Sequence, residues 1–159
     1  MRTRTFRLVI LAACLAFTAS VMAQEGHPLK GSWRGDWGPT ATHRNHIVIV
    51  MDWDGKTISG VVNPGPEAIP IKSAVLDITP GTPAQRAVEA EGNTPAQPAV
   101  PATPPIFKVR IEADAKDRAG NTVNFIGEGT IEDVGLPNRS IVGTWNHGNV
   151  RGDFRITRQ

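Results

Sequence analysis

The chain has 159 residues, a length that suits one domain. Its 17 lysine and arginine residues against 15 acidic residues give a formal net charge of +2, but three of the arginines lie in the first seven positions. The remainder carries 14 basic and 15 acidic residues, which argues against nucleic-acid binding, since that needs a basic surface. A single cysteine, Cys14, excludes a disulfide within the chain.

Residues 1–23 have the pattern of a secretory signal peptide. Three arginines precede an apolar run at 8–19, and Val21 and Ala23 are the small residues expected before a cleavage site. The run is too short to span a membrane. We expect cleavage after Ala23, export to the periplasm or the extracellular medium, and a single domain over residues 24–159.

The first part of that domain predicts four strands. Residues 31–37, 46–53 and 56–63 carry apolar residues in alternation, and Asp54-Gly55 is typical of a hairpin turn. The expected pairing across this turn sets Met51 opposite Ile58 and Ile49 opposite Gly60. Residues 69–77 form the expected fourth strand.

Residues 79–105 interrupt the alternation. They contain seven prolines and many alanines, and they repeat Thr-Pro-Ala-Gln at 82–85 and 94–97. Such a segment buries too little apolar surface to offset its ordering entropy, so we expect a disordered or polyproline-like insert. It is either a tolerated loop or a docking segment for a protein partner.

The last part of the chain predicts four more strands, at 106–113, 123–131, 139–146 and 149–157. In the last hairpin, Trp145 is expected opposite Val150. Eight short strands with short turns predict an all-β antiparallel meander, closed into a small barrel or folded as a sandwich.

Closure has a specific expected register. Arg34-Gly35-Asp36 lies in the first strand and Arg151-Gly152-Asp153 in the last. Pairing these strands antiparallel can set Arg34 opposite Asp153 and Gly35 opposite Gly152, with opposite charges facing each other across the outer surface. The sequence therefore predicts a closed barrel in this register.

The eight-stranded pattern, with Gly31-Ser32-Trp33 at its start and Gly143-Thr144-Trp145 near its end, resembles the lipocalin and fatty-acid-binding barrels of the calycin group. The runs at 35–38, 52–56 and 63–66 are similar to those of small exported bacterial proteins of unknown function. The calycin resemblance implies a cup for a small apolar ligand. A small barrel can also be filled by its own side chains.

The candidate site residues gather mostly at one end of this barrel, because the loops after the odd-numbered strands of a meander lie together. The residues expected there are Trp37, His43, Arg44, His46, Asn63 and His147. We predict a ligand-binding set of Trp37, Trp53, Arg44 and Asn63, in which the two tryptophans stack on the ligand.

Three function classes stay open. The first is a non-enzymatic binding protein for a small apolar or aromatic ligand or an envelope partner, without a cofactor. The second is a metal protein or enzyme using His43, His46 and His147, although a spacing of three puts His43 and His46 on opposite faces of a continuing strand. The third is a structural module with a solid interior. The sequence contains no Gly-x-Ser-x-Gly motif, which favours the first class.

Overall fold

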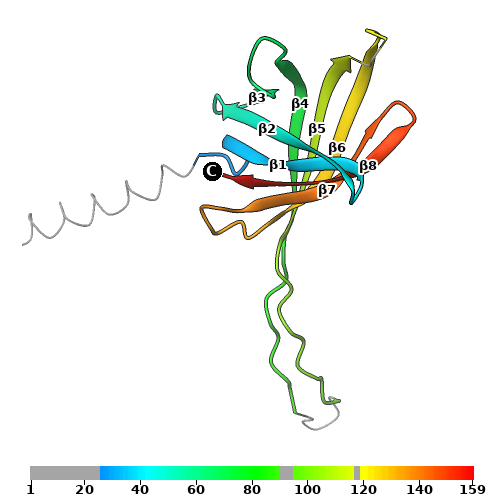
Figure 1. Cartoon of the computed structure of the whole chain (residues 1–159). Coiled ribbons are helices and arrows are strands. Elements are labelled where there is room, and N and C mark those ends of the chain that lie inside the picture. The colour runs from blue at the N-terminus through cyan, green and yellow to red at the C-terminus, as the bar shows by residue number, and fades with distance from the viewer. Residues whose placement is uncertain (1–25, 90–94, 117–118) are drawn as a thin grey trace, which may run out of the picture.

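A computed structural model describes residues 26–89, 95–116 and 119–159. Eight strands form one antiparallel sheet that follows the chain order and closes on itself (Figure 1). The strands are β1 (Gly31–Thr40), β2 (His43–Trp53), β3 (Ile58–Val62), β4 (Ile69–Thr79), β5 (Ile106–Lys116), β6 (Thr122–Glu132), β7 (Ser140–His147) and β8 (Val150–Arg158). The expected signal peptide and its cleavage site lie outside the described residues.

The predicted fold class is confirmed: the sheet is an all-β meander, and β8 pairs with β1 to close a small barrel. The barrel is the alternative that the structure selects over the sandwich. Within the described ranges, no helix is long and apolar enough to cross a membrane.

The predicted closure register is wrong by four residues. Gly35 lies opposite Ile156 rather than Gly152, and Gly38 lies opposite Asp153. The shift brings Asp153 near Arg44, whose guanidinium donates hydrogen bonds to the carboxylates of both Asp36 and Asp153. The hydrogen bonds that the Asp36 carboxylate accepts, followed by that to Asp153, raise the pKa of Arg44 because they stabilise its charged form. A charge bridge across three strands therefore replaces the expected two-strand ion pairs.

The first hairpin register is wrong by two residues, since Met51 lies opposite Gly60 and Trp53 opposite Ile58. The turn is longer than Asp54-Gly55 because the Asp54 carboxylate accepts hydrogen bonds from the backbone N–H groups of Thr57, at 2.7 Å, and Lys56, at 2.8 Å. These bonds lower the pKa of the Asp54 carboxyl. A two-residue shift keeps every side chain on its expected face.

The last hairpin shows the same two-residue error. Trp145 lies opposite Gly152 rather than Val150, because the turn consists of Gly148 and Asn149 and the pairing starts at His147 and Val150. Gly148 has a φ of 61°, which glycine adopts without steric cost.

The core fills one half of the barrel, which we call the closed end. Its fully buried side chains come from the start of β1 and β7, the end of β2 and β8, and the segment before β1: they are Trp33, Ile141, Met51, Ile156 and Leu29. The opposite half, where β1, β3, β5 and β7 end, is the open end.

The segment before β1 seals the closed end. The indole Nε1–H of Trp33 donates to the carbonyl of Leu29 at 2.8 Å. The guanidinium of Arg139 donates to the carbonyl of Pro28 through Nε at 2.9 Å and Nη2 at 2.7 Å, and it stands 6.0 Å from the Trp33 ring. Buried polar groups are thus paired where the chain enters the barrel.

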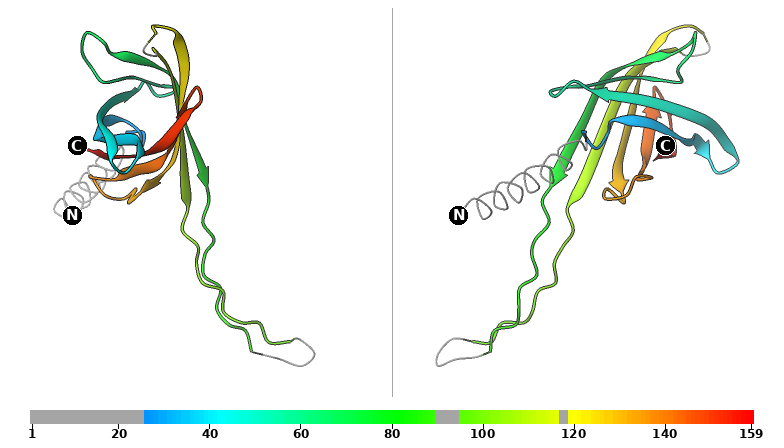
Figure 2. Two further views of the ribbon diagram at one scale, coloured as in Figure 1. Left: turned by 45° about the vertical axis from the view of Figure 1, so that its right-hand side comes forward. Right: turned by 90° about the vertical axis from the view of Figure 1, so that its left-hand side faces the viewer.

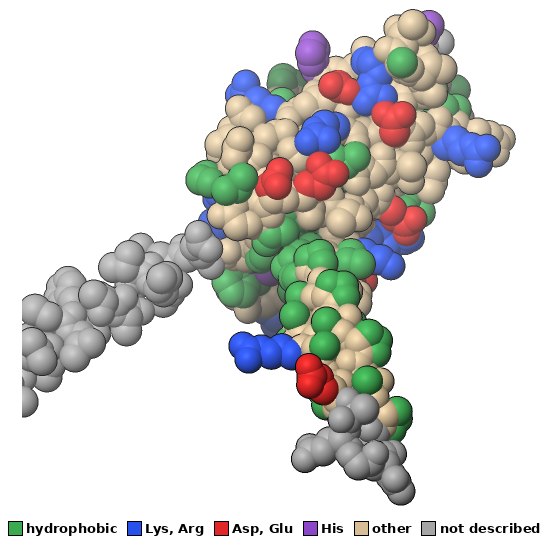
Figure 3. All heavy atoms as spheres, turned by 90° about the horizontal axis from the view of Figure 1, so that it is seen from below, with side chains coloured by type: hydrophobic (Ala, Val, Ile, Leu, Met, Phe, Trp, Pro, Cys, Tyr) green, Lys and Arg blue, Asp and Glu red, His purple; other side chains and the backbone are tan. Residues whose placement is uncertain are grey.

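The insert 80–105, which we call the arm, is described at residues 80–89 and 95–105, and these extend from the barrel between β4 and β5 (Figure 2). Its two described legs pair at Thr82–Thr103, Gln85–Val100 and Val88–Gln97. Hydrophobic side chains are exposed along the arm and at its base, including those of Val88, Val100 and Ile106 (Figure 3). The expected disorder of this insert concerns motion and stays a prediction.

We predict that Gly152→Ala destabilises the barrel, because a Cβ at this position would stand 2.7 Å from the carbonyl carbon of Gly38 and 2.8 Å from Cα of Pro39. The strands β1 and β8 would have to separate, at a cost on the order of 1–3 kcal/mol in the free energy of unfolding. Urea unfolding measures this loss. Gly135→Ala, whose Cβ meets nothing within 4 Å, is the matched control. Equal stability of the two variants would contradict the close approach of β1 and β8.

Candidate functional site

A cavity of about 180 Å³ lies inside the open end of the barrel. Side chains from seven strands and one loop line it: Trp37, Ile47, Val62, Asn63, Ile69, Ala113, Ala115, Lys116, Phe125 and His147. Strand alternation explains most of the set, because side chains two residues apart on a strand, such as Ala113 and Ala115 of β5, point to the same face. Lys116 is the last residue of β5 and lines the mouth. Most of the wall is apolar.

Three aromatic rings pack together beside the cavity, and two of them, Trp37 and Phe125, line it. The Trp37 ring meets that of Phe125 edge to face at 5.9 Å and that of Trp145 at 4.6 Å, and the Phe125 and Trp145 rings stack at 6.0 Å. Trp145 is buried and its Nε1–H donates to the carbonyl of Asp153 at 3.1 Å. This bond fixes the ring behind Trp37, which leaves Trp37 and Phe125 to line the cavity.

His147 supplies an unpaired polar atom in this wall. It is the last residue of β7, and its Nε2 is buried without a hydrogen-bond partner among the residues that the structure describes. A buried polar atom without a partner costs about 1–3 kcal/mol. Because His147 also lines the cavity, its imidazole is a candidate partner for a polar group of a ligand.

Asn63 also lines the cavity, but much of its role is structural. It has a φ of 50°, its N–H donates to the carbonyl of Val48 at 2.7 Å, and its Oδ1 accepts from the N–H of Val48 at 3.0 Å. These bonds attach the loop after β3 to β2. The structure therefore brings Trp37, Asn63 and His147 together as expected. The side-chain oxygen Oδ1 of Asn63 already accepts a hydrogen bond from Val48.

The other candidates from this end lie outside the barrel. Arg44 bridges Asp36 and Asp153 on the outer surface, His46 lies opposite Asp36 on that surface, and the side chain of His43 is exposed. Within the residues that the structure describes, no group of three or more His, Cys, Asp or Glu side chains can hold a metal ion. The structure does not bring His43 and His46 to His147.

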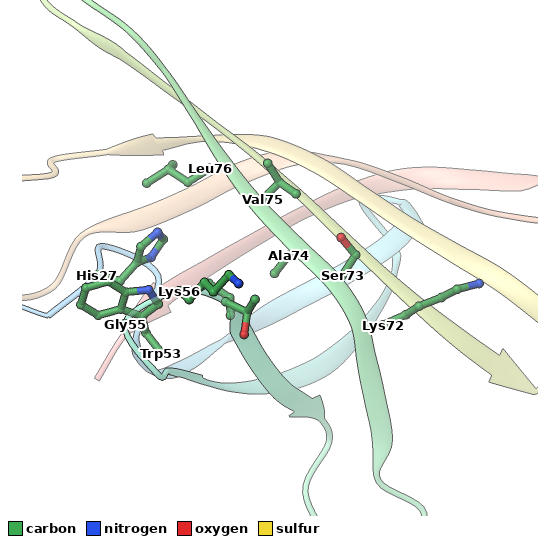
Figure 4. Close-up of a pocket in the computed structure, with 11 residues that line it drawn as sticks. His27, Trp53, Gly55, Lys56, Lys72, Ser73, Ala74, Val75 and Leu76 are labelled. Carbon is green, nitrogen blue, oxygen red and sulfur yellow. The ribbon is translucent and has the colours of Figure 1, made fainter.

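Trp53 lies away from the cavity, at a separate cleft between β3 and β4 (Figure 4). This β3–β4 cleft has a volume of about 590 Å³ and is bordered by His27, the 53–58 turn and residues 72–76 of β4. It exists because β3 and β4 pair only at Val61–Pro70 and Val62–Ile69, and Pro70 has no N–H to donate. The predicted ligand-binding residues thus lie in three places: Trp37 and Asn63 at the open-end cavity, Arg44 on the outer surface and Trp53 at the β3–β4 cleft.

Several site residues were not anticipated from the sequence. Phe125 and Lys116 line the cavity, and His27 contacts Trp53 with ring centroids 5.6 Å apart. The alternation of β6 already placed Phe125 inward, so its position could have been found. His27 lies in a segment without periodicity, and nothing in the sequence indicated its contact.

We predict that His27 titrates below its ordinary value of 6.5, because burial disfavours the charged imidazolium and lowers its pKa. Its Nδ1 accepts the N–H of Leu29 at 3.3 Å, a bond that protonation there removes. The unfolded chain then binds more protons, so stability falls as the pH drops from above 6.5 through the folded pKa. NMR titration of the His27 ring, assigned with His27→Gln, measures the midpoint. A midpoint above 6.5 would contradict the burial of this ring.

Comparisons with protein-family models, curated proteins and solved structures found no match to the chain. The roles of the open-end cavity and the β3–β4 cleft are therefore inferred from the residues that line them and from their geometry.

Proposed function

We propose that the chain is an exported, non-enzymatic binding protein whose open-end cavity takes one small aromatic or apolar ligand. The observation that carries this proposal is the buried, unpartnered Nε2 of His147 in a cavity wall that is otherwise mostly apolar. Ligand sites commonly combine an apolar lining with a few polar groups that fix orientation. The aromatic side chains Trp37 and Phe125 offer faces and edges for stacking on a ring.

The size of the cavity limits the ligand. An apolar cavity of about 150 Å³ holds a benzene molecule, and the open-end cavity measures about 180 Å³. The closed end is filled by Trp33, Met51 and their neighbours, so the ligand cannot extend deeper into the barrel. We therefore propose a ligand of about one ring, with a hydroxyl or similar group directed to His147.

Two features of the chain support the wider proposal. The closed eight-stranded meander agrees with the resemblance to lipocalin-type barrels, which implies an internal site for a small apolar ligand. The pattern of residues 1–23 supports export. Intact-mass analysis of protein from its own host tests export with cleavage after Ala23: a mature chain beginning at Gln24 agrees with it, a lipid-modified Cys14 contradicts the cleavage site, and an uncleaved chain contradicts export.

We predict that the protein binds toluene and phenol at the open end, as measured by calorimetric titration. Ala115→Leu should abolish the binding of both, because the longer side chain fills the cavity that Ala115 lines. Val50→Leu, on the exposed outer face of β2, is the matched control and should bind like the wild type. His147→Phe should weaken phenol relative to toluene by roughly three- to tenfold, through loss of one hydrogen bond.

Absence of binding to the wild type, or binding that Ala115→Leu leaves unchanged, would overturn the proposal. The structural module with a solid interior would then be the function to test. Thermal unfolding of each variant shows whether a loss of binding reflects a filled cavity in a folded barrel.

A further inference from the structure

The legs of the arm have a period of three rather than two. The backbone bonds between them join residues 82, 85 and 88 on one leg to 103, 100 and 97 on the other, each pair exchanging two N–H···O bonds of 2.8 to 3.1 Å. A β-ladder repeats every two residues, whereas a polyproline II helix has three residues per turn. The arm therefore consists of two antiparallel polyproline-type legs.

The sequence agrees with this period. On the second leg, Pro95, Pro98, Pro101 and Pro104 occupy every third position. Proline has no N–H, and these positions are those where no bond to the first leg is needed. With three residues per turn, the four prolines share one face. We call this face the proline ridge, and all its residues are exposed.

The β3–β4 cleft has the features of a groove for such a ridge. Polyproline II segments bind grooves lined by aromatic side chains, and Trp53 and His27 stand side by side at this cleft, with Ile58 and Leu76 also lining it (Figure 4). The cleft borders are strand edges: β4 pairs with β5 on one side and, beyond Pro70, has no β3 partner on the other.

Unpaired strand edges and a proline-rich leg complement each other. An edge strand presents N–H groups that seek acceptors. A proline-rich leg offers carbonyl groups but few donors, so it can accept these bonds without competing for them. Lys56 and Lys72 at the same cleft add donors for carbonyl groups.

We propose that the proline ridge of one molecule binds the β3–β4 cleft of a second copy, giving a symmetric dimer with two reciprocal contacts. A second copy is the favoured partner because ridge and cleft occur on the same polypeptide, while the arm points away from its own barrel in every view (Figures 1 and 2). Two identical contacts of this kind are what a twofold axis generates. This proposal does not depend on the open-end cavity.

The test uses sedimentation velocity on the wild type and three variants. In the first variant, Asn-Gly replaces residues 80–105 and joins Thr79 to Ile106, which already lie opposite each other. In the second, Trp53→Ala removes the cleft aromatic ring; Trp37→Ala, at the open end, is its matched control. Thermal unfolding of the arm-deleted variant should stay within a few degrees of the wild type, because the arm is exposed.

We expect the wild type and Trp37→Ala to dimerise, and the arm-deleted and Trp53→Ala variants to dissociate roughly tenfold more readily or more. Mixing the last two should give a heterodimer that one ridge–cleft contact holds together, weaker than the wild-type dimer, because Trp53→Ala supplies the ridge and the arm-deleted variant supplies the cleft. A synthetic peptide of residues 94–105 should also bind the arm-deleted variant.

Three outcomes would overturn the proposal: a monomeric wild type, a dimer that survives deletion of the arm, or a mixture that forms no heterodimer even at the highest protein concentration tested. A monomer whose arm-deleted variant still binds the peptide would assign the cleft to a proline-rich segment of another protein.

Discussion

The pairing of β1 with β8 is the contact on which the other features of this molecule depend. Glycines allow it: a Cβ on Gly35 or Gly152 would collide with the backbone of the opposite strand. Arg44 holds the same junction from outside through Asp36 and Asp153. Each exposed ion pair contributes little, so close backbone approach and the buried core supply most of the stability.

Closure makes the two ends of the barrel different. Leu29 and Trp33 fill one end and tie it to Arg139, whereas the other end keeps a cavity beside Trp37 and His147. The shortest strand, β3, leaves the sheet weakly paired to β4, and the cleft opens there. The same meander thus forms the open-end cavity, whose size suits a small ligand, and the β3–β4 cleft, whose shape suits an extended chain.

The sequence was sufficient for the strands, their inward faces and the closed meander, because alternation with a period of two fixes which side chains are buried. It was insufficient for registers. The registers depend on the hydrogen bonds of the Asp54 side chain, on the backbone conformation of Gly148 and on the ion pairs of Arg44. The alternation of apolar and polar residues reveals none of these features. The candidate site was predicted in part: parity of the loops gathered Trp37, Asn63 and His147. The outward position of His46 follows from the alternation of β2, which buries Ile47. The separate cleft at Trp53 follows from the short pairing of β3 with β4.

The most direct test of this description is a set of backbone NOEs between β1 and β8 in isotopically labelled protein. The structure predicts cross-strand NOEs that link Gly35 with Ile156 and Trp37 with Phe154. NOEs linking Gly35 with Gly152 would show a register shifted by four residues and would separate Asp153 from Arg44. Absence of any NOE between these strands, in a folded protein, would show an open sheet and would contradict the barrel on which the open-end cavity and the β3–β4 cleft depend.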